Sequence, residues 1–255
     1  MSKSIFDLSG KVAVITGASK GIGESIAHGL AAFGAKVIAS SRKQEAVDEV
    51  AAAIKSNGFE ATAIACHVGD EDQLKNLVEK TIEIYGRIDI LINNAATNPV
   101  FGPIENSEAA VFDKIMQVNV RAPFILTNLV HPIMKANGGG SIINISSVEG
   151  LKPSFGLGLY SVSKAALLMM TKNQAKEWGK DGIRVNNICP GLVKTKFSSA
   201  IWQNEGLLKQ FEQHLPLHRM AAPDEMTGLA IFLASEASSY CTGGEFVADG
   251  GHMLI

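Results

Sequence analysis

The 255-residue chain has few of the features that mark secreted, metal-binding or membrane proteins. Its three cysteines, Cys66, Cys189 and Cys241, are far apart and form no Cys-x-x-Cys motif, so neither a disulfide framework nor a zinc site is predicted. No window approaches the ~18 consecutive apolar residues of a membrane span, and the N-terminal residues lack the apolar centre of a signal peptide. We therefore expect a cytoplasmic protein with free thiols and no membrane partner.

The charges give no sign of a polyanionic partner. The 23 Lys and Arg residues nearly balance the 25 Asp and Glu residues, and no long run carries one sign, so no nucleic-acid surface is predicted. His214 and His218 have the spacing of paired metal ligands, but Pro216 between them disfavours a continuous helix. The sequence predicts no metal site.

Short apolar runs alternate with longer helical patterns along most of the chain. Such runs are typical of strands that are buried on both faces of a parallel sheet. The predicted strands are Val12–Ile15, Lys36–Ala39, Ala61–Cys66, Ile88–Ile92, Ser141–Ile145, Arg184–Ile188 and Glu245–Val247, with helical patterns at Ile22–Phe33, Gln44–Ser56, Asp72–Tyr85, Ile115–Lys135 and Ala165–Trp178. This alternation and the chain length predict a single α/β domain, residues 1–255, with a doubly wound parallel sheet.

One long segment, residues 190–218, has only weak helical patterning. Gly191, Gly206 and Pro216 interrupt it. Irregular segments of this length in a compact domain are usually lids or binding loops. We expect this one to cover the substrate.

A glycine-rich turn follows the first predicted strand directly. Thr16–Gly23 contains Gly-x-x-x-Gly-x-Gly and leads into a helical pattern. Glycines allow the backbone to approach a pyrophosphate, and the helix N-terminus offers free N–H groups to it. No Gly-Lys-Ser/Thr follows, so dinucleotide binding is predicted rather than nucleotide hydrolysis.

The end of the second predicted strand indicates which dinucleotide the protein binds. An acid about 20 residues beyond the glycine turn would hold the ribose 2′-hydroxyl of NAD. The chain instead reads Ser40-Ser41-Arg42-Lys43. A guanidinium binds phosphate through two parallel hydrogen bonds, and Lys20 adds a second positive charge. NADP(H) is therefore favoured over NAD(H).

Tyr160 and Lys164 are the strongest candidates for the chemistry. Residues four apart share one helix face, so the phenol and the ammonium should lie together. A nearby cation lowers the pKa of a phenol towards neutrality, which suits a general acid or base. The pair also occurs by chance on surface helices, and its weight comes from the other motifs.

Taken in order, Thr16–Gly23, Asn93-Asn94-Ala95-Ala96, Asn119, Ser147, Tyr160 and Lys164 resemble the classical short-chain dehydrogenase/reductase family over nearly the whole length. The resemblance implies a Rossmann-type, three-layer α/β/α domain with seven parallel strands. It also implies NAD(P)-dependent interconversion of alcohols and carbonyls.

The resemblance assigns four catalytic roles. Tyr160 matches the acid that protonates the carbonyl oxygen, and Lys164 matches the residue that lowers its pKa and contacts the nicotinamide ribose. Ser147 matches the hydroxyl that orients the carbonyl. Asn119 matches the asparagine that holds a water between the lysine and solvent.

The resemblance also assigns a cofactor-binding set. Asn93 matches an asparagine that stabilises the central sheet. His67 stands where the family often has an adenine-contacting aspartate, and Ala96 replaces a glycine. The predicted cofactor-binding residues are Gly17, Ser19, Lys20, Gly21, Ile22, Gly23, Ser41, Arg42, His67, Val68, Asn94, Ala95, Tyr160, Lys164, Pro190, Gly191, Val193 and Thr195.

Together these motifs predict an NADPH-preferring carbonyl reductase, or a secondary-alcohol dehydrogenase in reverse. Apolar residues in the 190–218 segment, such as Phe197 and Trp202, suggest a bulky apolar substrate. A 3-ketoacyl-thioester reductase shares the core motifs, and a catalytically silent cofactor-binding relative is the alternative from another class. The resemblance also implies a homotetramer, with Phe124, Leu126, Met169, Met170 and Trp178 on the pairing helices.

Overall fold

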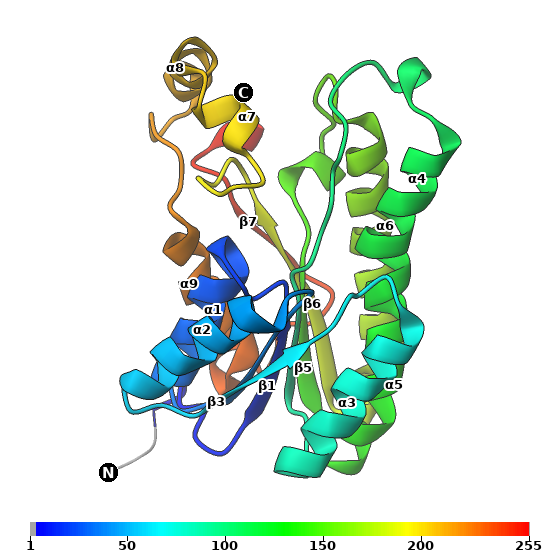
Figure 1. Cartoon of the computed structure of the whole chain (residues 1–255), viewed down its shortest axis with the longest axis vertical. Coiled ribbons are helices and arrows are strands. Elements are labelled where there is room, and N and C mark those ends of the chain that lie inside the picture. The colour runs from blue at the N-terminus through cyan, green and yellow to red at the C-terminus, as the bar shows by residue number, and fades with distance from the viewer. Residues whose placement is uncertain (1–3, 255) are drawn as a thin grey trace.

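A computed structural model describes residues 4–254, which form one sheet between two layers of helices (Figure 1). All neighbouring strands pair in parallel, in the order β3-β2-β1-β4-β5-β6-β7. The strands are β1 Val12–Thr16, β2 Lys36–Ser41, β3 Ala61–Ala65, β4 Ile90–Asn93, β5 Gly140–Ile145, β6 Ile183–Pro190 and β7 Glu245–Ala248. The predicted seven-stranded, doubly wound parallel sheet is confirmed.

The helices divide between the two faces of this sheet. Figure 1 shows α1, α2 and α9 on one side and α3, α5 and α6 on the other. The helices are α1 Gly21–Ala32, α2 Gln44–Ser56, α3 Glu71–Tyr85, α4 Ala109–Met116, α5 Ala122–Ala136, α6 Gly158–Trp178, α7 Ser199–Trp202, α8 Glu205–His214 and α9 Thr227–Ala234. No helix among the described residues has both the length and the hydrophobicity of a membrane span.

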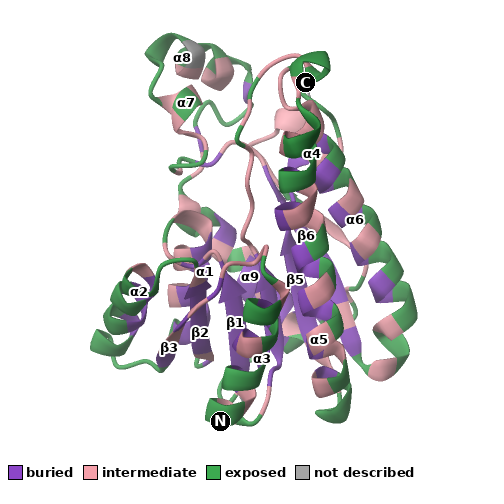
Figure 2. Cartoon of the chain, turned by 45° about the vertical axis from the view of Figure 1, so that its right-hand side comes forward, coloured by how far each residue is buried: buried purple, intermediate pink, exposed green. Residues whose placement is uncertain are grey.

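Each face of the sheet has its own hydrophobic core. In β1, Ala13 and Ile15 pack in the core under α1 and α9, whereas Val14 packs with Leu74 and Leu126 on the opposite face. Successive side chains of a strand point to opposite faces, so a strand covered on both faces must be apolar throughout. The central strands are accordingly buried (Figure 2).

The segment 190–218 is more regular than its sequence predicts. It contains α7 and α8, which lie beyond the carboxyl ends of the central strands (Figure 1). Gly206 inside α8 weakens the helical pattern, and Pro216 follows two residues after α8 ends. Short helices with such residues give little periodic signal, so the prediction of an irregular loop was wrong here.

The helical pattern at Ile115–Lys135, predicted as one or two helices, divides into two in the structure. A π-helical turn, Gln117–Arg121, joins α4 to α5. Pro123, in the first turn of α5, has no N–H to donate, so the regular hydrogen-bond ladder is incomplete there. Such π turns are frequent at functional sites, and this one contains Asn119.

The predicted subunit-pairing residues differ in exposure. Phe124 and Met169 are 51% and 57% exposed. Leu126 is buried in the core, and the Trp178 ring lies 4.7 Å from the imidazole of His131. Leu126 therefore packs inside the subunit, which agrees with the expectation that part of this set belongs to the core.

Candidate active site

The strand order places a ligand site between β1 and β4. The chain runs outward to β2 and β3 on one side and to β5, β6 and β7 on the other, which makes the β1–β4 junction the topological switch point. Open α/β sheets bind ligands beyond the carboxyl ends of the strands at this point. The glycine turn after β1 and the Asn-Asn-Ala-Ala segment at the end of β4 meet there.

The glycine turn has the geometry of an anion cradle. Gly17 and Gly21 have φ angles of 66° and 62°, a region that favours glycine. A Cβ on Gly23 would lie 2.5 Å from the Gly17 carbonyl oxygen, so a side chain does not fit there. No side chain caps the N-terminus of α1, and its first N–H groups stay available to an anion.

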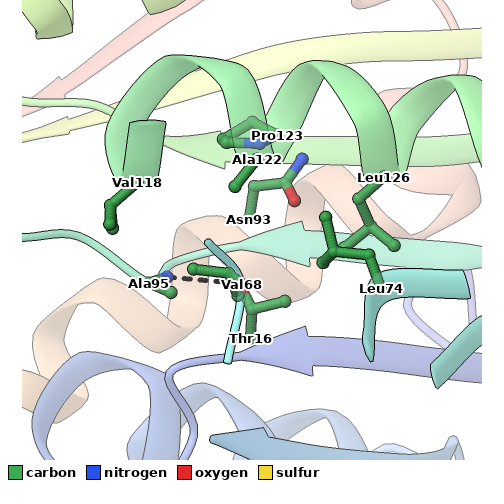
Figure 3. Close-up of a pocket in the computed structure, with 9 residues that line it drawn as sticks. All are labelled: Thr16, Val68, Leu74, Asn93, Ala95, Val118, Ala122, Pro123 and Leu126. Atoms are coloured by element: carbon green, nitrogen blue, oxygen red, sulfur yellow. Dashed lines mark hydrogen bonds between the residues drawn. The ribbon is translucent and has the colours of Figure 1, made fainter. Parts of the chain in front are cut away.

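Asn94 fixes this turn from the neighbouring strand. Its side-chain amide donates to the carbonyl oxygens of Thr16 and Gly17, both at 3.0 Å. The Thr16 hydroxyl accepts from the N–H groups of Asn94 and Ala95, at 3.1 and 3.2 Å. Figure 3 shows the Thr16–Ala95 bond beside a small pocket that Val68 also lines. Three of the predicted cofactor-binding residues, Val68, Asn94 and Ala95, therefore lie together.

The carboxyl end of β2 adds positive charge to this region. The hydroxyls of Ser19 and Ser41 lie 3.1 Å apart, which joins the glycine turn to β2. Arg42 and Lys20 are exposed, and within residues 4–254 neither side chain forms a hydrogen bond or an ion pair. A phosphate would therefore displace no existing partner of either cation.

His67, the predicted adenine contact, lies two residues after the end of β3. It accepts a hydrogen bond from the N–H of Gly69 through Nδ1, at 3.1 Å.

Ser147, Tyr160 and Lys164 meet beyond the carboxyl end of β5. All three are at least 91% buried. The Lys164 ammonium donates to the carbonyl oxygen of Ile145 at 2.7 Å and lies 5.5 Å from the centre of the Tyr160 ring. The Ser147 hydroxyl accepts from the N–H of Glu149 at 3.1 Å. The predicted convergence of these three residues is present in the structure.

The pKa of Tyr160 differs from the value expected from the sequence. Burial raises the pKa of this phenol above its ordinary value, the Ser147 side chain lowers it, and the Glu149 carboxylate raises it. Burial also lowers the pKa of Lys164 to about 8. The sequence argument counted the lysine charge but not the desolvation of the phenol. The expected fall of the Tyr160 pKa towards neutrality is therefore wrong for the free protein.

The side-chain amide of Asn119 forms three hydrogen bonds that hold this residue in place in the π turn. The amide oxygen accepts from the N–H of Thr97 at 2.8 Å, and the amide nitrogen donates to the Thr97 carbonyl and to the Ser163 hydroxyl, both at 3.0 Å. Both donors and one acceptor site of this amide are therefore in use. A water predicted at Asn119 would have to use its backbone carbonyl or the remaining side-chain acceptor site.

A polar chain across the sheet holds α6 in register with the strands. Asn93 donates to Asn144 at 2.8 Å, and Asn144 donates to the Thr171 hydroxyl at 2.7 Å. Thr171, on α6, lies 3.0 Å from the Asn187 amide oxygen on β6. Buried polar groups need such partners. The predicted stabilising role of Asn93 agrees with this chain of bonds.

The segment that leaves the end of β6 at Pro190 contacts two parts of the site. The Gly191 N–H donates to Ala248 at 3.0 Å, and the buried Val193 pairs with Ala221. A Cβ on Gly21 would lie 3.2 Å from the Thr195 methyl carbon. Two residues later, the Phe197 ring lies 5.6 Å from the Tyr160 ring. One short segment, which begins at Pro190, therefore touches both the anion cradle and the tyrosine.

Sequence reasoning missed the bracing role of Asn94 and the positions of Asn144, Thr171 and Glu149. Asn94, Asn144 and Thr171 act through contacts between segments distant in the sequence, whereas Glu149 acts through its nearer neighbours Ser154 and Ser161. Only the asparagines within apolar strands, such as Asn186-Asn187 in the middle of β6, could have indicated a polar chain through the sheet.

Comparisons with known proteins agree with this geometry. A family model described as enoyl-(acyl carrier protein) reductase matches residues 17–253. Dehydrogenase/reductase SDR family member 4 of Oryctolagus cuniculus is 43% identical over 244 residues, which are 96% of this chain and 94% of the relative.

Two solved structures are similar over almost the whole chain. A putative NAD(P)-dependent gluconate 5-dehydrogenase from Beutenbergia cavernae, with bound NADP, has a TM-score of 0.94 and 34% identity and covers 99% of this chain and 100% of its own. A 7α-hydroxysteroid dehydrogenase complexed with NADH and 7-oxo glycochenodeoxycholic acid has a TM-score of 0.93 and 34% identity, with 98% of each chain covered. The chain belongs to the short-chain dehydrogenase/reductase family and is an NAD(P)-dependent oxidoreductase.

Proposed function

We propose that this protein is an NADPH-preferring carbonyl reductase that also oxidises secondary alcohols, with Tyr160 as its acid and base. The observation that carries the proposal is the link between two parts of the site. The segment from Pro190 to Phe197 reaches the anion cradle at Gly21 and the phenol of Tyr160. A dinucleotide held by the cradle would end beside the phenol.

The residues of the site fit a dinucleotide phosphate. The cradle has room only for backbone at Gly17 and Gly23, and the N-terminus of α1 is uncapped. Arg42, with Lys20, would hold the 2′-phosphate, and Lys164 would contact the nicotinamide ribose. The bound cofactor supplies a hydride to the carbonyl carbon and accepts one in the reverse direction.

The protein supplies orientation and a proton. The Ser147 hydroxyl accepts its backbone bond through oxygen, so its hydrogen can be donated to the Tyr160 oxygen or to a substrate carbonyl oxygen. Tyr160 then gives its phenolic proton to that oxygen, which becomes the alcohol hydroxyl. Lys164 and Asn119 support the return of a proton to the phenolate from solvent. In oxidation the same steps run backwards.

The surroundings of Tyr160 favour an apolar substrate. Phe197 lies against the tyrosine and is 53% exposed, and Phe155, in the loop before α6, is 80% exposed. The Phe101 ring packs on Gly156 of the same loop, where a Cβ would lie 2.9 Å from the ring. We propose that segment 190–218 covers the substrate and that these aromatic rings contact it.

An activity panel tests the proposal. We expect purified protein to oxidise NADPH with apolar ketones, diketones or aldehydes, at least tenfold faster than NADH at equal concentrations. Acyl thioesters are one arm of the panel. A clear preference for them would favour the 3-ketoacyl-thioester reductase instead. Cofactor binding without turnover on any arm would favour the silent relative.

We also propose that the protein is a cytoplasmic homotetramer. Its described cysteines are all free thiols, as in a reducing compartment. Helices α4, α5 and α6 carry the exposed side chains of Phe112, Phe124 and Met169, and Phe124 also lines a groove together with Met116 and Met170. A second copy would cover these apolar side chains through a symmetric contact.

Replacement of Phe124 tests this assembly. In Phe124→Glu, two symmetry-related faces would carry added carboxylates, so we expect the tetramer to dissociate into dimers or monomers. Light scattering after gel filtration measures the mass. Phe59→Glu is the matched control, because Phe59 is also an exposed aromatic residue but precedes β3. An unchanged tetramer in Phe124→Glu would place the interface elsewhere.

A further inference from the structure

Glu149 connects the loop between Ser147 and Tyr160 to the first turn of α6. Its carboxylate accepts from the N–H and the hydroxyl of Ser154, at 2.9 and 2.6 Å. It also accepts from the hydroxyl of Ser161 at 3.0 Å. Ser161 is 5% exposed and directly follows Tyr160 in α6. One side chain thus ties the loop to the helix turn that carries the phenol.

The backbone of Glu149 acts on the other side of the same site. Its N–H donates to the Ser147 hydroxyl oxygen at 3.1 Å and so directs the Ser147 hydrogen elsewhere. Glu149 lies in the 3₁₀ turn Val148–Gly150, which Ser147 caps. The position of this turn therefore sets the orientation of the Ser147 hydroxyl, and the Glu149 carboxylate fixes the turn to α6.

We propose that Glu149 is a positioning residue that fixes the Ser147 hydroxyl relative to the Tyr160 phenol through its bonds to Ser154 and Ser161. The inference rests on the proposed roles of Ser147 and Tyr160. Misplacement of reacting groups by about 1 Å can cost roughly a hundredfold in rate. The three accepted hydrogen bonds therefore matter to turnover more than to cofactor binding, because the anion cradle lies on other elements.

The charge of Glu149 provides a second readout. Glu149 from the 3₁₀ turn and Lys164 from α6 itself lie close to the phenol, and the Cys189 thiol of β6 faces Lys164. The Glu149 carboxylate raises the pKa of Tyr160. Its neutralisation should lower that pKa, so alcohol oxidation, which needs the phenolate, should begin at lower pH.

Four variants separate the effect of the hydrogen bonds of Glu149 from the effect of its charge. In Glu149→Ala we expect kcat to fall about ten- to a hundredfold, with the Kd of NADPH within twofold of the wild type. In Ser161→Ala, which keeps the charge, we expect a smaller fall in kcat. The double variant should be no slower than Glu149→Ala, because both changes break the same bond. In Glu149→Gln, the pH midpoint of alcohol oxidation should move down.

Glu177→Gln is the matched control, because this exposed glutamate lies near the far end of α6. A kcat of Glu149→Ala within twofold of this control would overturn the inference, as would additive losses in the double variant or an unmoved midpoint in Glu149→Gln. If Glu149→Ala does not fold, as judged by circular dichroism, Ser161→Ala and Glu149→Gln decide the question. Tyr160→Phe is measured in parallel. If it keeps its rate, the proposed function fails, whereas an inactive Tyr160→Phe beside unaffected Glu149 variants rejects this inference alone.

Discussion

In Tyr160→Phe we expect turnover to fall about a hundred- to ten-thousandfold while NADPH still binds. The substitution removes one oxygen atom and keeps the ring that packs near Phe197 and Lys164. The carbonyl oxygen then has no general acid to protonate it, and a positioned general acid contributes roughly a hundred- to ten-thousandfold to rate. The anion cradle is on different elements, so the cofactor should lose little affinity.

The measurement is NADPH oxidation with the best ketone of the panel, together with the Kd of NADPH from fluorescence titration. Tyr240→Phe is the matched control, since Tyr240 is fully exposed and lies outside the site. Wild-type rates in Tyr160→Phe would remove the phenol from the mechanism. Loss of NADPH binding would instead indicate that the phenolic hydroxyl supports the fold of the site or contacts the cofactor.

The pKa values of Tyr160 and Lys164 indicate what favours and what disfavours the phenolate. Burial disfavours the phenolate, and the Ser147 hydroxyl offsets part of that effect. Lys164, with a pKa of about 8, carries its charge at neutral pH and loses it as the pH rises above that value. A protonated Lys164 favours the phenolate, so its help to alcohol oxidation is present below about pH 8 and fades above it.

The sequence predicted the sheet well because burial on both faces leaves a direct pattern. Val12–Thr16 and Gly140–Ile145 are almost continuous apolar runs, and the structure places both in the centre of the sheet. The spacing of the tyrosine–lysine pair follows from helix geometry, but the pair also occurs by chance on other helices and took its weight from the other motifs along the chain. The strand patterns depend only on neighbours in the sequence.

The missed features depend on contacts between distant segments. Asn94 reaches back to Gly17 and Asn144 reaches α6, and no periodicity marks either bond. The desolvation of Tyr160 depends on everything packed around it, including Phe197 from the segment after β6. A single sequence carries no signal for such surroundings. The candidate catalytic residues were therefore easier to predict than the surroundings that set their pKa values.

The largest change in specificity is expected in Arg42→Asp. Arg42 has no partner among the described residues, and its guanidinium is free to bind a 2′-phosphate through two hydrogen bonds. A hydrogen bond to a charged group is worth about 1.5–3 kcal/mol, so its loss should lower kcat/KM for NADPH roughly ten- to a hundredfold. The new carboxylate repels a 2′-phosphate and accepts from a ribose hydroxyl. We therefore expect NADH to become the better cofactor.

The experiment compares kcat/KM for NADPH and NADH in the wild type, in Arg42→Asp and in Lys80→Glu. Lys80 is exposed on α3, and its replacement makes the same change in net charge away from β2. A general electrostatic effect would move both variants alike and would remove Arg42 as the discriminating residue. A reversal confined to Arg42→Asp, with kcat on the preferred cofactor little changed, would mean that the end of β2 selects the cofactor and Tyr160 acts equally with either one.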